Sequence, residues 1–593
     1  MVASDPDKAG AIRIDGDFDP FTLDVIKNRL ASIADEMALT VARTARSFIV
    51  KEALDYSTAL FASDGEFIAQ GTCLPLHLGS MPSALEAVVR TFGNDLAPGD
   101  IFALNDPYDG GTHLPDIIAV KPVFDDQVLL GYASCIAHQT DMGGRVPGSM
   151  ACDSTEIYQE GLRLPPLRLY QAGEPVATIF RIIERNVRVP DKVLGDIHSQ
   201  IAACRIGERG LMELVERYGL EQFQGYCREL LDYTERYTRS QIADLPDGAF
   251  DFTDHIDGDG IEPGAITIQV KVTVAGDTMT IDFAGTSPQV KGAINSVHSF
   301  TASAAWACVR SIFDNDIPNN AGYFRPIRVL TPEGSIVNPR PPAAVAARGL
   351  TGDRVADTVF GALAQLLPDR VPASGPHAPD TAVSFGGYYA DGKPFVYIEG
   401  LVGSWGGGPD RDGMDASTGT IVNYSNTPAE LLEVEQPLVI ERYALVPDSG
   451  GPGRYRGGLA LERHIRFLAD EAVLQVRSDR HDFAPYGLNG GLPGAHARLR
   501  LIRADGTVEE FFSQFLATVR KGDVLEVGLA SGGGHGDPLE REPQRVLHDV
   551  IEGKVTVPHA ADAYGVVIAG EPPMILAAET AALRARQQRQ RDP

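Results

Sequence analysis

The sequence predicts a multidomain α+β protein with mixed sheets, helical segments in its N-terminal and central parts, and a β-rich C-terminal part. The chain has 593 residues, which is more than one hydrophobic core usually holds. Apolar residues recur every three or four positions in several segments, which is typical of helices. Between residues 430 and 530 short strand-like segments such as "AVLQVRSD" and "ARLRLIRA" follow one another instead.

The first predicted helix covers residues 19–45. Asp19 is suited to the N-cap and Pro20 to the first helical position, and apolar side chains then follow on one face as far as Val41. The next part of the chain alternates between short strands and one helix, at 57–63 (strand), 67–70 (strand), 81–93 (helix), 100–106 (strand), 117–124 (strand) and 128–138 (strand).

The remaining chain divides by composition. Long helices are predicted at 196–245, a strand pair at 266–285, and further helices at 300–315 and 353–367. Residues 368–425 are rich in glycine, proline and aspartate. We therefore expect five parts: a flexible tail (1–18), an N-terminal α/β domain with the functional site (19–250), a central α/β domain (251–430), a β-rich domain (431–545) and a helical tail (546–593).

Charge and apolar pattern exclude several classes of partner. The formal net charge is −28, which repels nucleic acid and anionic membranes. No apolar run approaches the length of a membrane span, and the N-terminus lacks the apolar core of a secretory signal. The six cysteines are scattered and include no Cys-x-x-Cys pair, so we expect reduced, mostly buried thiols and a cytoplasmic protein.

The segment "LNDPYDGGTHLPDIIAV" places polar residues between two predicted strands. The strands on either side of residues 125–127 form a predicted hairpin, in which paired residue numbers sum to roughly 252–254. Asp116 and His138 meet this condition, and His113 precedes Asp116 by three residues. The spacing therefore brings two imidazoles and one carboxylate together.

Such a set of nitrogen and oxygen ligands suits a divalent transition metal, namely Zn, Mn or Fe. Three protein ligands leave positions open for water or substrate. Asp106, Asp109 and Asp141 are candidates to support these ligands or to replace one. The alternative is an elaborate turn without a metal, since Asp-Gly and Asn-Asp-Pro are common turn formers.

Three other polar segments stand out. The glycine-rich segment 531–538 lacks the Gly-Lys-Ser/Thr ending of a phosphate loop, which favours a tight turn. His77 lies among apolar neighbours, as a core histidine would. Residues 477–491, which begin with Arg477, Asp479 and Arg480, either line a pocket or form a salt-bridged strand end.

Several ordered motifs resemble the hydantoinase B/oxoprolinase family. They are "KEALDYSTALF", "PLHLGSMP", "NDPYDGGTHLPDI", "HQTDMGG", "DIPNNAGYFRPI", "NPRPPAAVAAR", "DSGGPGRYRGG" and "GGGHGDPLER". The resemblance covers about residues 19–545. The family includes B subunits of ATP-dependent N-methylhydantoinases, the C-terminal half of 5-oxoprolinases, and subunits of acetone and acetophenone carboxylases.

The resemblance implies a hydantoinase A-type partner that uses ATP and Mg, in a hetero-oligomer such as an A2B2 assembly. This chain would then complete the ring opening of a hydantoin or lactam. Related carboxylase subunits hold a metal with a His-x-x-Asp pair and a downstream histidine, which His113, Asp116 and His138 match. Asp141 or His77 would move protons. The alternatives are a metal-containing subunit of a ketone carboxylase and a non-catalytic scaffold for the A-type subunit.

Overall fold

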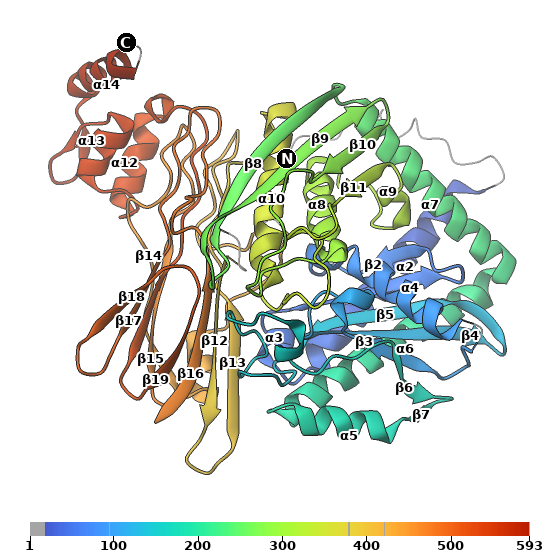
Figure 1. Ribbon diagram of the computed structural model, residues 1–593. Coiled ribbons are helices and arrows are strands. Elements are labelled where there is room, and N and C mark those ends of the chain that lie inside the picture. The colour runs from blue at the N-terminus through green and yellow to red at the C-terminus, as the bar shows by residue number, and fades with distance from the viewer. Residues whose placement is uncertain (1–17, 94, 377–379, 420, 592–593) are drawn as a thin grey trace.

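The computed structural model describes residues 18–591 except 94, 377–379 and 420, and it has the predicted mixed α+β class (Figure 1). The flexible tail predicted at 1–18 lies outside the described residues apart from Phe18. No described helix is long and apolar enough to cross a membrane. The six cysteines are free thiols, and all except Cys73 are buried, as the sequence predicts.

The N-terminal part is built on a seven-stranded antiparallel sheet in the order β2-β1-β5-β4-β3-β6-β7. The predicted strands are present, and two short ones extend the edge of the sheet. The bounds are β1 Tyr56–Ala62, β2 Phe67–Gln70, β3 Ile101–Leu104, β4 Asp116–Asp125, β5 Val128–His138, β6 Leu167–Gln171 and β7 Glu174–Pro175.

Helices cover both faces of this sheet because its central strands are apolar on both sides. Ala119 and Val123 share one core with the helices α2, α6 and α7, whereas Ile118 and Val120 share the other with α4. Asp19 caps α2 by accepting a hydrogen bond from the Thr22 amide, as predicted. The helices are α2 Pro20–Thr44, α3 Phe48–Lys51, α4 Ser80–Phe92, α5 Ala177–Asn186, α6 Pro190–Tyr218 and α7 Leu220–Ala243.

The central part is a four-stranded sheet in the order β11-β10-β9-β8, with α10 packed across β8 and β9. Its helix α8 lies against both α10 and α4, so the cores of the central and N-terminal parts are continuous. The elements are β8 Gly248–Gly258, β9 Pro263–Ala275, β10 Thr278–Asp282, β11 Ile327–Leu330, α8 His298–Ile312, α9 Ala321–Phe324 and α10 Arg348–Leu366.

Two sheets pack face to face in the C-terminal part and enclose an apolar core (Figure 1, left). Their orders are β13-β12-β16-β19 and β14-β15-β20-β17-β18. The strands are β12 Thr381–Tyr388, β13 Pro394–Gly400, β14 Leu438–Leu445, β15 Leu461–Phe467, β16 Glu471–Ser478, β17 Arg498–Ile502, β18 Val508–Phe511, β19 Phe515–Arg520 and β20 Val524–Gly528.

The last residues form the helical tail that the sequence predicts, together with a two-stranded ribbon. The preceding glycine segment 531–538 makes backbone contacts: the Gly533 amide donates to the Ser374 carbonyl and the Gly534 amide to the Leu492 carbonyl, each at 2.8 Å. The elements are α11 Ala429–Glu435, before β14, and then α12 Pro543–Ile551, α13 Val557–Tyr564, β21 Ile568–Ala569, β22 Met574–Ile575 and α14 Ala577–Arg591.

Several strands were missed by the sequence pattern, among them β8, β11, β12 and β13. Gly386 and Gly387 interrupt the apolar run of β12, although Val383 and Phe385 pack in the sandwich core. The sheet that contains β12 and β13 joins residues from both sides of position 430. The five-part division of the chain stays a prediction.

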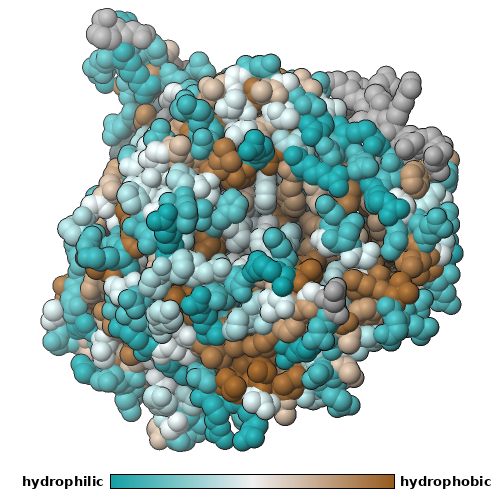
Figure 2. Space-filling view, turned by 45° about the vertical axis from the view of Figure 1, so that its right-hand side comes forward, coloured by the Kyte–Doolittle hydropathy of each residue, from teal (hydrophilic) through white to brown (hydrophobic). Residues whose placement is uncertain are grey.

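The surface is mostly hydrophilic, in keeping with the net charge of −28, but apolar residues gather in patches on the face shown in Figure 2. The most exposed large apolar side chains include Phe21, 82% exposed, and Val434, 83% exposed.

Helix α6 approaches α2 closely because two glycines face its neighbours. A Cβ added at Gly210 would lie 2.6 Å from Ile33 Cγ1, and one at Gly207 would lie 2.7 Å from Met37 Sδ. A side chain at either position must push apart two helices that already fill their contact.

We therefore expect Gly210→Leu to lower the thermal unfolding midpoint, because overpacking a filled contact costs about 1–3 kcal/mol. Met212→Leu is the matched control, since Met212 lies on the same helix and is 43% exposed. An unchanged midpoint in Gly210→Leu would show that the two helices separate without cost.

Candidate metal centre

The hairpin of β4 and β5 brings two of the predicted ligands together. Asp116 begins β4, His138 ends β5, and the two residues are directly paired across the strands, as the predicted register requires. A tight turn, in which the Asp116 amide donates to the His113 carbonyl at 3.0 Å, adds His113 to the pair. Ligand atoms of the three side chains all lie within 4.8 Å of one another.

Each of the three buried side chains has one polar atom without a hydrogen-bond partner among the described residues. These atoms are His113 Nε2, Asp116 Oδ1 and His138 Nδ1. The first two are 3.3 Å apart, and the imidazole centroids are 4.9 Å apart. Buried polar atoms are normally satisfied, so three unsatisfied atoms in one group make it a candidate site for a ligand that accepts electron pairs.

The opposite atoms of two of these side chains, His113 and Asp116, are held by the surrounding protein. His113 Nδ1 lies 2.9 Å from the Ala346 carbonyl, which fixes its proton there and leaves Nε2 as the acceptor. Asp116 Oδ2 accepts hydrogen bonds from the Thr112 hydroxyl and from Arg348 Nη2. This arrangement orients ligand atoms as outer hydrogen bonds do around bound metals.

Burial and nearby charges set the protonation of the group. Burial lowers the pKa of His113 and that of His138, so both imidazoles are neutral at pH 7. Burial alone would raise the pKa of Asp116, but the adjacent Arg348 guanidinium outweighs burial and holds that pKa well below its usual range. The result is two neutral nitrogen donors and one carboxylate, the protonation states that metal binding requires.

A cavity lies beside this group, and His113 and His138 form part of its wall. Polar side chains on the wall include His77 and Asp55, and the remaining lining is largely apolar. Such a mixture of apolar wall and few polar groups is typical of small-molecule sites. The apolar lining includes Leu74, Leu76, Phe300, Leu350 and Ile398.

Only one of the two predicted catalytic residues lies on this cavity. His77 lines it, with Nδ1 3.0 Å from the Ser57 hydroxyl, and burial lowers its pKa to about 4. The Asp141 carboxylate instead accepts bonds from Arg188 Nη1 at 2.9 Å and from three backbone amides, one of them that of Gly148. Asp141 therefore holds a loop together.

Asp106 and Asp109 are likewise bound elsewhere. Asp106 caps the short helix η2 (Pro107–Asp109) and accepts a 2.7 Å bond from Arg163 Nε. Asp109 pairs with Arg90 and is partly exposed. The structure brings neither carboxylate into the group of three.

Three polar residues of the site were missed by sequence reasoning. Arg348 binds Asp116, and Asp55 lines the cavity, where burial and then the neighbouring Asp116 raise its pKa to about 8. The Tyr424 hydroxyl donates to Asp55 Oδ2 at 3.1 Å. Asp55 and Arg348 fall within the motifs "KEALDYS" and "NPRPPAAVAAR", but only long-range folding shows which residues they face.

Glu160 is a further missed residue that positions His113. Its Oε1 accepts 2.8 Å hydrogen bonds from the Val345 and Ala346 amides, next to the carbonyl that holds the His113 ring. Its side chain is fully buried, and burial raises the pKa of Glu160 to about 8.

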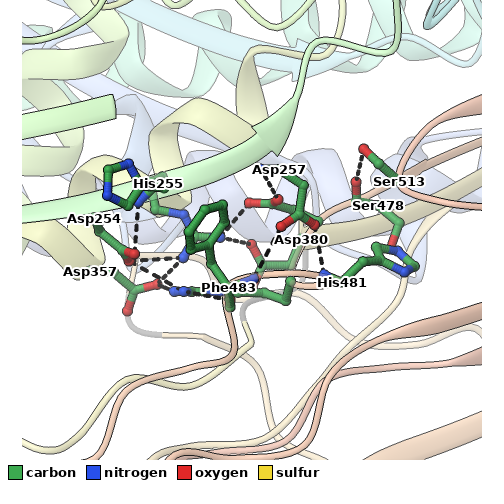
Figure 3. A network of polar contacts seen from close by, with 12 residues as sticks. Asp254, His255, Asp257, Asp357, Asp380, Ser478, His481, Phe483 and Ser513 are labelled. Atoms are coloured by element: carbon green, nitrogen blue, oxygen red, sulfur yellow. Dashed lines mark hydrogen bonds and ion pairs between the residues drawn. The ribbon is translucent and has the colours of Figure 1, made fainter. Parts of the chain in front are cut away.

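Segment 477–491 both lines a pocket and forms salt bridges at a strand end, through different residues. Arg477 lines the cavity. Asp479 and Arg480 belong to a buried ionic network with Asp254 and Asp357, which Figure 3 shows between the central sheet and the C-terminal part.

The fold and the site together identify the class of protein. Residues 19–538 match the sequence model of "Hydantoinase B/oxoprolinase", so the chain belongs to the hydantoinase B/oxoprolinase family. The resemblance in the sequence motifs is therefore confirmed.

Individual relatives and solved structures are similar to this chain over nearly its whole length. The B subunit of a putative D-/L-hydantoinase from Pseudomonas sp. (strain NS671) is 35% identical over 571 residues, which cover 93% of this chain and 95% of the relative. The crystal structure of ATP-dependent caprolactamase from Pseudomonas jessenii superimposes with a TM-score of 0.89 at 33% identity, over 96% of this chain and 100% of the other. The nucleotide-free structure of acetone carboxylase also has a TM-score of 0.89, over 98% of this chain and 85% of the other, but its 20% identity shows a shared fold alone.

The buried Glu160 carboxyl predicts a pH effect on stability. Its pKa is about 8 in the folded chain against an ordinary value of 4.5, so the folded state binds the extra proton. This contribution to stability is fully present below about pH 4.5 and is lost as the pH rises through about 8. Glutamine keeps the accepting oxygen but cannot ionise.

We expect Glu160→Gln to gain thermal stability relative to the wild type on going from pH 5.5 to pH 8.5, as measured by unfolding midpoints. Glu156→Gln, at an exposed neighbouring position, should follow the wild type at both values. A constant difference between Glu160→Gln and the wild type would mean that Glu160 is ionised in the folded chain throughout.

Proposed function

We propose that this chain is the B subunit of an ATP-dependent cyclic amidase, which completes the hydrolytic ring opening of a hydantoin or lactam at a metal centre. The observation that supports this most is the group His113, Asp116 and His138, whose three unpartnered atoms are buried beside a cavity. The relatives named for hydantoinase and caprolactamase activity point to a cyclic amide as the substrate class.

The donor set fits Zn, Mn or Fe, because two neutral imidazoles and one carboxylate are present and hard all-oxygen coordination is absent from the group. When bound, such a metal supplies Lewis acidity that polarises a carbonyl or lowers the pKa of water. Arg348 and Thr112 would keep Asp116 Oδ1 directed at the ion, and the Ala346 carbonyl would keep His113 Nε2 unprotonated.

The cavity wall supplies groups that can handle protons. The imidazole of His77 is neutral, and its Nδ1 is held by Ser57, so Nε2 is left to exchange a proton with the substrate. The Asp55 carboxyl, held by Tyr424, is a second such group. The apolar lining limits the access of water other than the reacting molecule.

A partner completes the proposal. An A-type subunit would use ATP and Mg to activate the amide, a poor electrophile, before this chain acts on it. The putative hydantoinase relative is itself described as a subunit, which supports a hetero-oligomer such as A2B2. The six free thiols fit a reducing compartment, so we place the complex in the cytoplasm.

The metal content of the purified chain tests the proposed metal centre. We expect about one divalent transition metal per chain in the wild type, and its loss from His138→Ala, because removing one of three ligands leaves too few. Elemental analysis of the purified chains provides the measurement. His548→Ala is the matched control, since the His548 side chain is 68% exposed on α12.

Equal metal content in wild type and His138→Ala would refute the proposed metal centre. Circular dichroism of the chelated wild type is the accompanying check. We expect the fold to survive chelation, since three ligands at the end of one hairpin are a small part of the core.

The reaction is tested with the A–B complex in heavy-oxygen water with ATP, Mg and a panel of cyclic amides. We expect the heavy oxygen in a ring-opened linear acid by mass spectrometry, and no ATP hydrolysis by this chain alone, because it lacks a phosphate-cradling loop. The complex with His138→Ala should lose most of its ring-opening activity.

The same assay separates the two alternatives. A parallel reaction contains a ketone and bicarbonate in place of the cyclic amide. A carboxylated ketone, without turnover of any lactam, would show that the chain is a carboxylase subunit. Acetone carboxylase shares this fold. Unchanged ring opening with His138→Ala would show that this chain is a scaffold for a reaction on the partner.

A further inference from the structure

Arginines are the largest fully buried side chains of the described chain, and one of them differs from the rest. Four have a carboxylate partner. These pairs are Arg354 with Asp479, Arg480 with Asp357, Arg463 with Glu399 at 2.6 Å, and Arg541 with Asp549 at 2.7 Å. Among the described residues, Arg477 has no carboxylate within salt-bridge distance, although it is only 2% exposed.

Neutral groups anchor one side of the Arg477 guanidinium. Nη1 donates to the Met150 carbonyl at 3.1 Å and lies 3.2 Å from the Ser384 hydroxyl, on the neighbouring strand β12. Nη2 is buried and has no hydrogen-bond partner in the described part of the chain. The guanidinium is thus fixed in position with one NH2 group unused.

Arg477 lines the same cavity as His113 and His138, but it comes from a different sheet. The histidines lie at the end of the seven-stranded sheet, whereas Arg477 lies on β16 of the C-terminal sandwich. Its charge is close enough to contribute to the lowered pKa of His138, for which burial is the main cause. The cavity therefore has a candidate metal centre and an unpaired cation on its wall.

A buried cation without a negative partner is costly, so the lack of such a partner for Arg477 needs an explanation. Burial lowers the pKa of Arg477 only to about 10, which leaves it charged at pH 7. The nearby Cys152 thiol does not supply a negative charge, because burial raises the pKa of Cys152 to about 11. The described residues therefore give Arg477 no negative partner.

We propose that Arg477 is the anion-binding residue of this cavity, and that its free Nη2 takes an oxygen of a carboxylate or phosphate group on the ligand that lies against the candidate metal centre. This inference rests on the proposed function and deepens it. It assigns an anionic oxygen group to the substrate or product, at the side of the cavity that faces β16. Guanidinium groups suit such planar or tetrahedral oxygen groups better than ammonium groups do.

The proposal follows from the chemistry of ring opening as well as from the geometry. Hydrolysis of a cyclic amide breaks the C–N bond, adds the oxygen of water to the carbonyl carbon, moves one proton of that water to the nitrogen and releases the other to solvent, so that a carboxylate and an amine result. The carboxylate is a new anion inside a largely apolar cavity. Arg477 is the described residue on the cavity wall that can neutralise it without giving up an existing ion pair.

The test measures anion binding by the full-length, metal-free chain with two probes, inorganic phosphate and acetate, by isothermal titration calorimetry. We expect saturable binding of at least one probe by the wild type, and the preferred probe identifies the oxygen group. Arg477→Met should bind it roughly tenfold or more weakly, as is usual for loss of a charged hydrogen bond. Arg477→Lys should retain part of the affinity. Arg442→Met, at an exposed arginine on β14, should bind as the wild type does.

Stability gives a readout that a merely structural arginine would not share. Without anions, the thermal midpoint of Arg477→Met should equal or exceed that of the wild type, because an unpaired buried charge has been removed. Added phosphate or acetate should raise the midpoint of the wild type alone. If Arg477→Met does not fold, a weakened affinity in Arg477→Lys carries the test.

Equal anion binding by wild type and Arg477→Met, or no saturable binding of either probe by the wild type, would overturn the proposal. Metal content, measured in parallel after reloading, keeps the two proposals apart. A wild type that binds anions through Arg477 but no metal would refute the metal centre and leave the anion site standing. If wild type and Arg477→Met bind metal equally and also bind anions with equal affinity, the anion site is refuted and the metal centre stands.

Discussion

The antiparallel register of β4 and β5 is the constraint on which the candidate site depends. Because side chains alternate between the faces of a strand, a shift of one residue would turn Asp116 and His138 away from each other. Both faces of this hairpin are apolar, so the hydrophobic pattern alone does not choose the register. Gln200 on α6 helps to fix it, since its Nε2 donates to the Ile117 carbonyl at 2.7 Å and to the Cys135 carbonyl at 2.9 Å, on the two paired strands.

Buried charges then join the separate sheets around this hairpin. Arg348, the first residue of α10, connects the central part to Asp116. The network of Figure 3 binds β8, α10 and the segment after β16 through Asp254, Asp357 and neighbouring arginines. Such pairs tolerate little change, because removing one partner leaves an uncompensated charge in the interior. Arg477 is the exception that has neutral partners, and it lines the cavity beside the candidate metal centre.

The sequence was sufficient where the contacts are local and insufficient where they are distant. The pairing of Asp116 with His138 follows from one short turn, and the N-cap of α2 follows from neighbouring residues, so these predictions are confirmed. Glycines hid β12, whose pairing with β16 brings Arg477 to the cavity. Asp55 and Arg348 reach the site across more than fifty residues of intervening chain, and no spacing rule relates them to the hairpin. Their roles required the folded structure.

The most direct test of the account is a crystal structure of the purified chain with anomalous diffraction collected at the absorption edge of the metal found by elemental analysis. The account predicts a single anomalous peak in bonding contact with His113 Nε2, Asp116 Oδ1 and a ring nitrogen of His138. It would be contradicted by a peak at another place in the metal-loaded protein. A direct hydrogen bond between a protonated His113 Nε2 and Asp116 Oδ1, with no peak beside it, would contradict it equally.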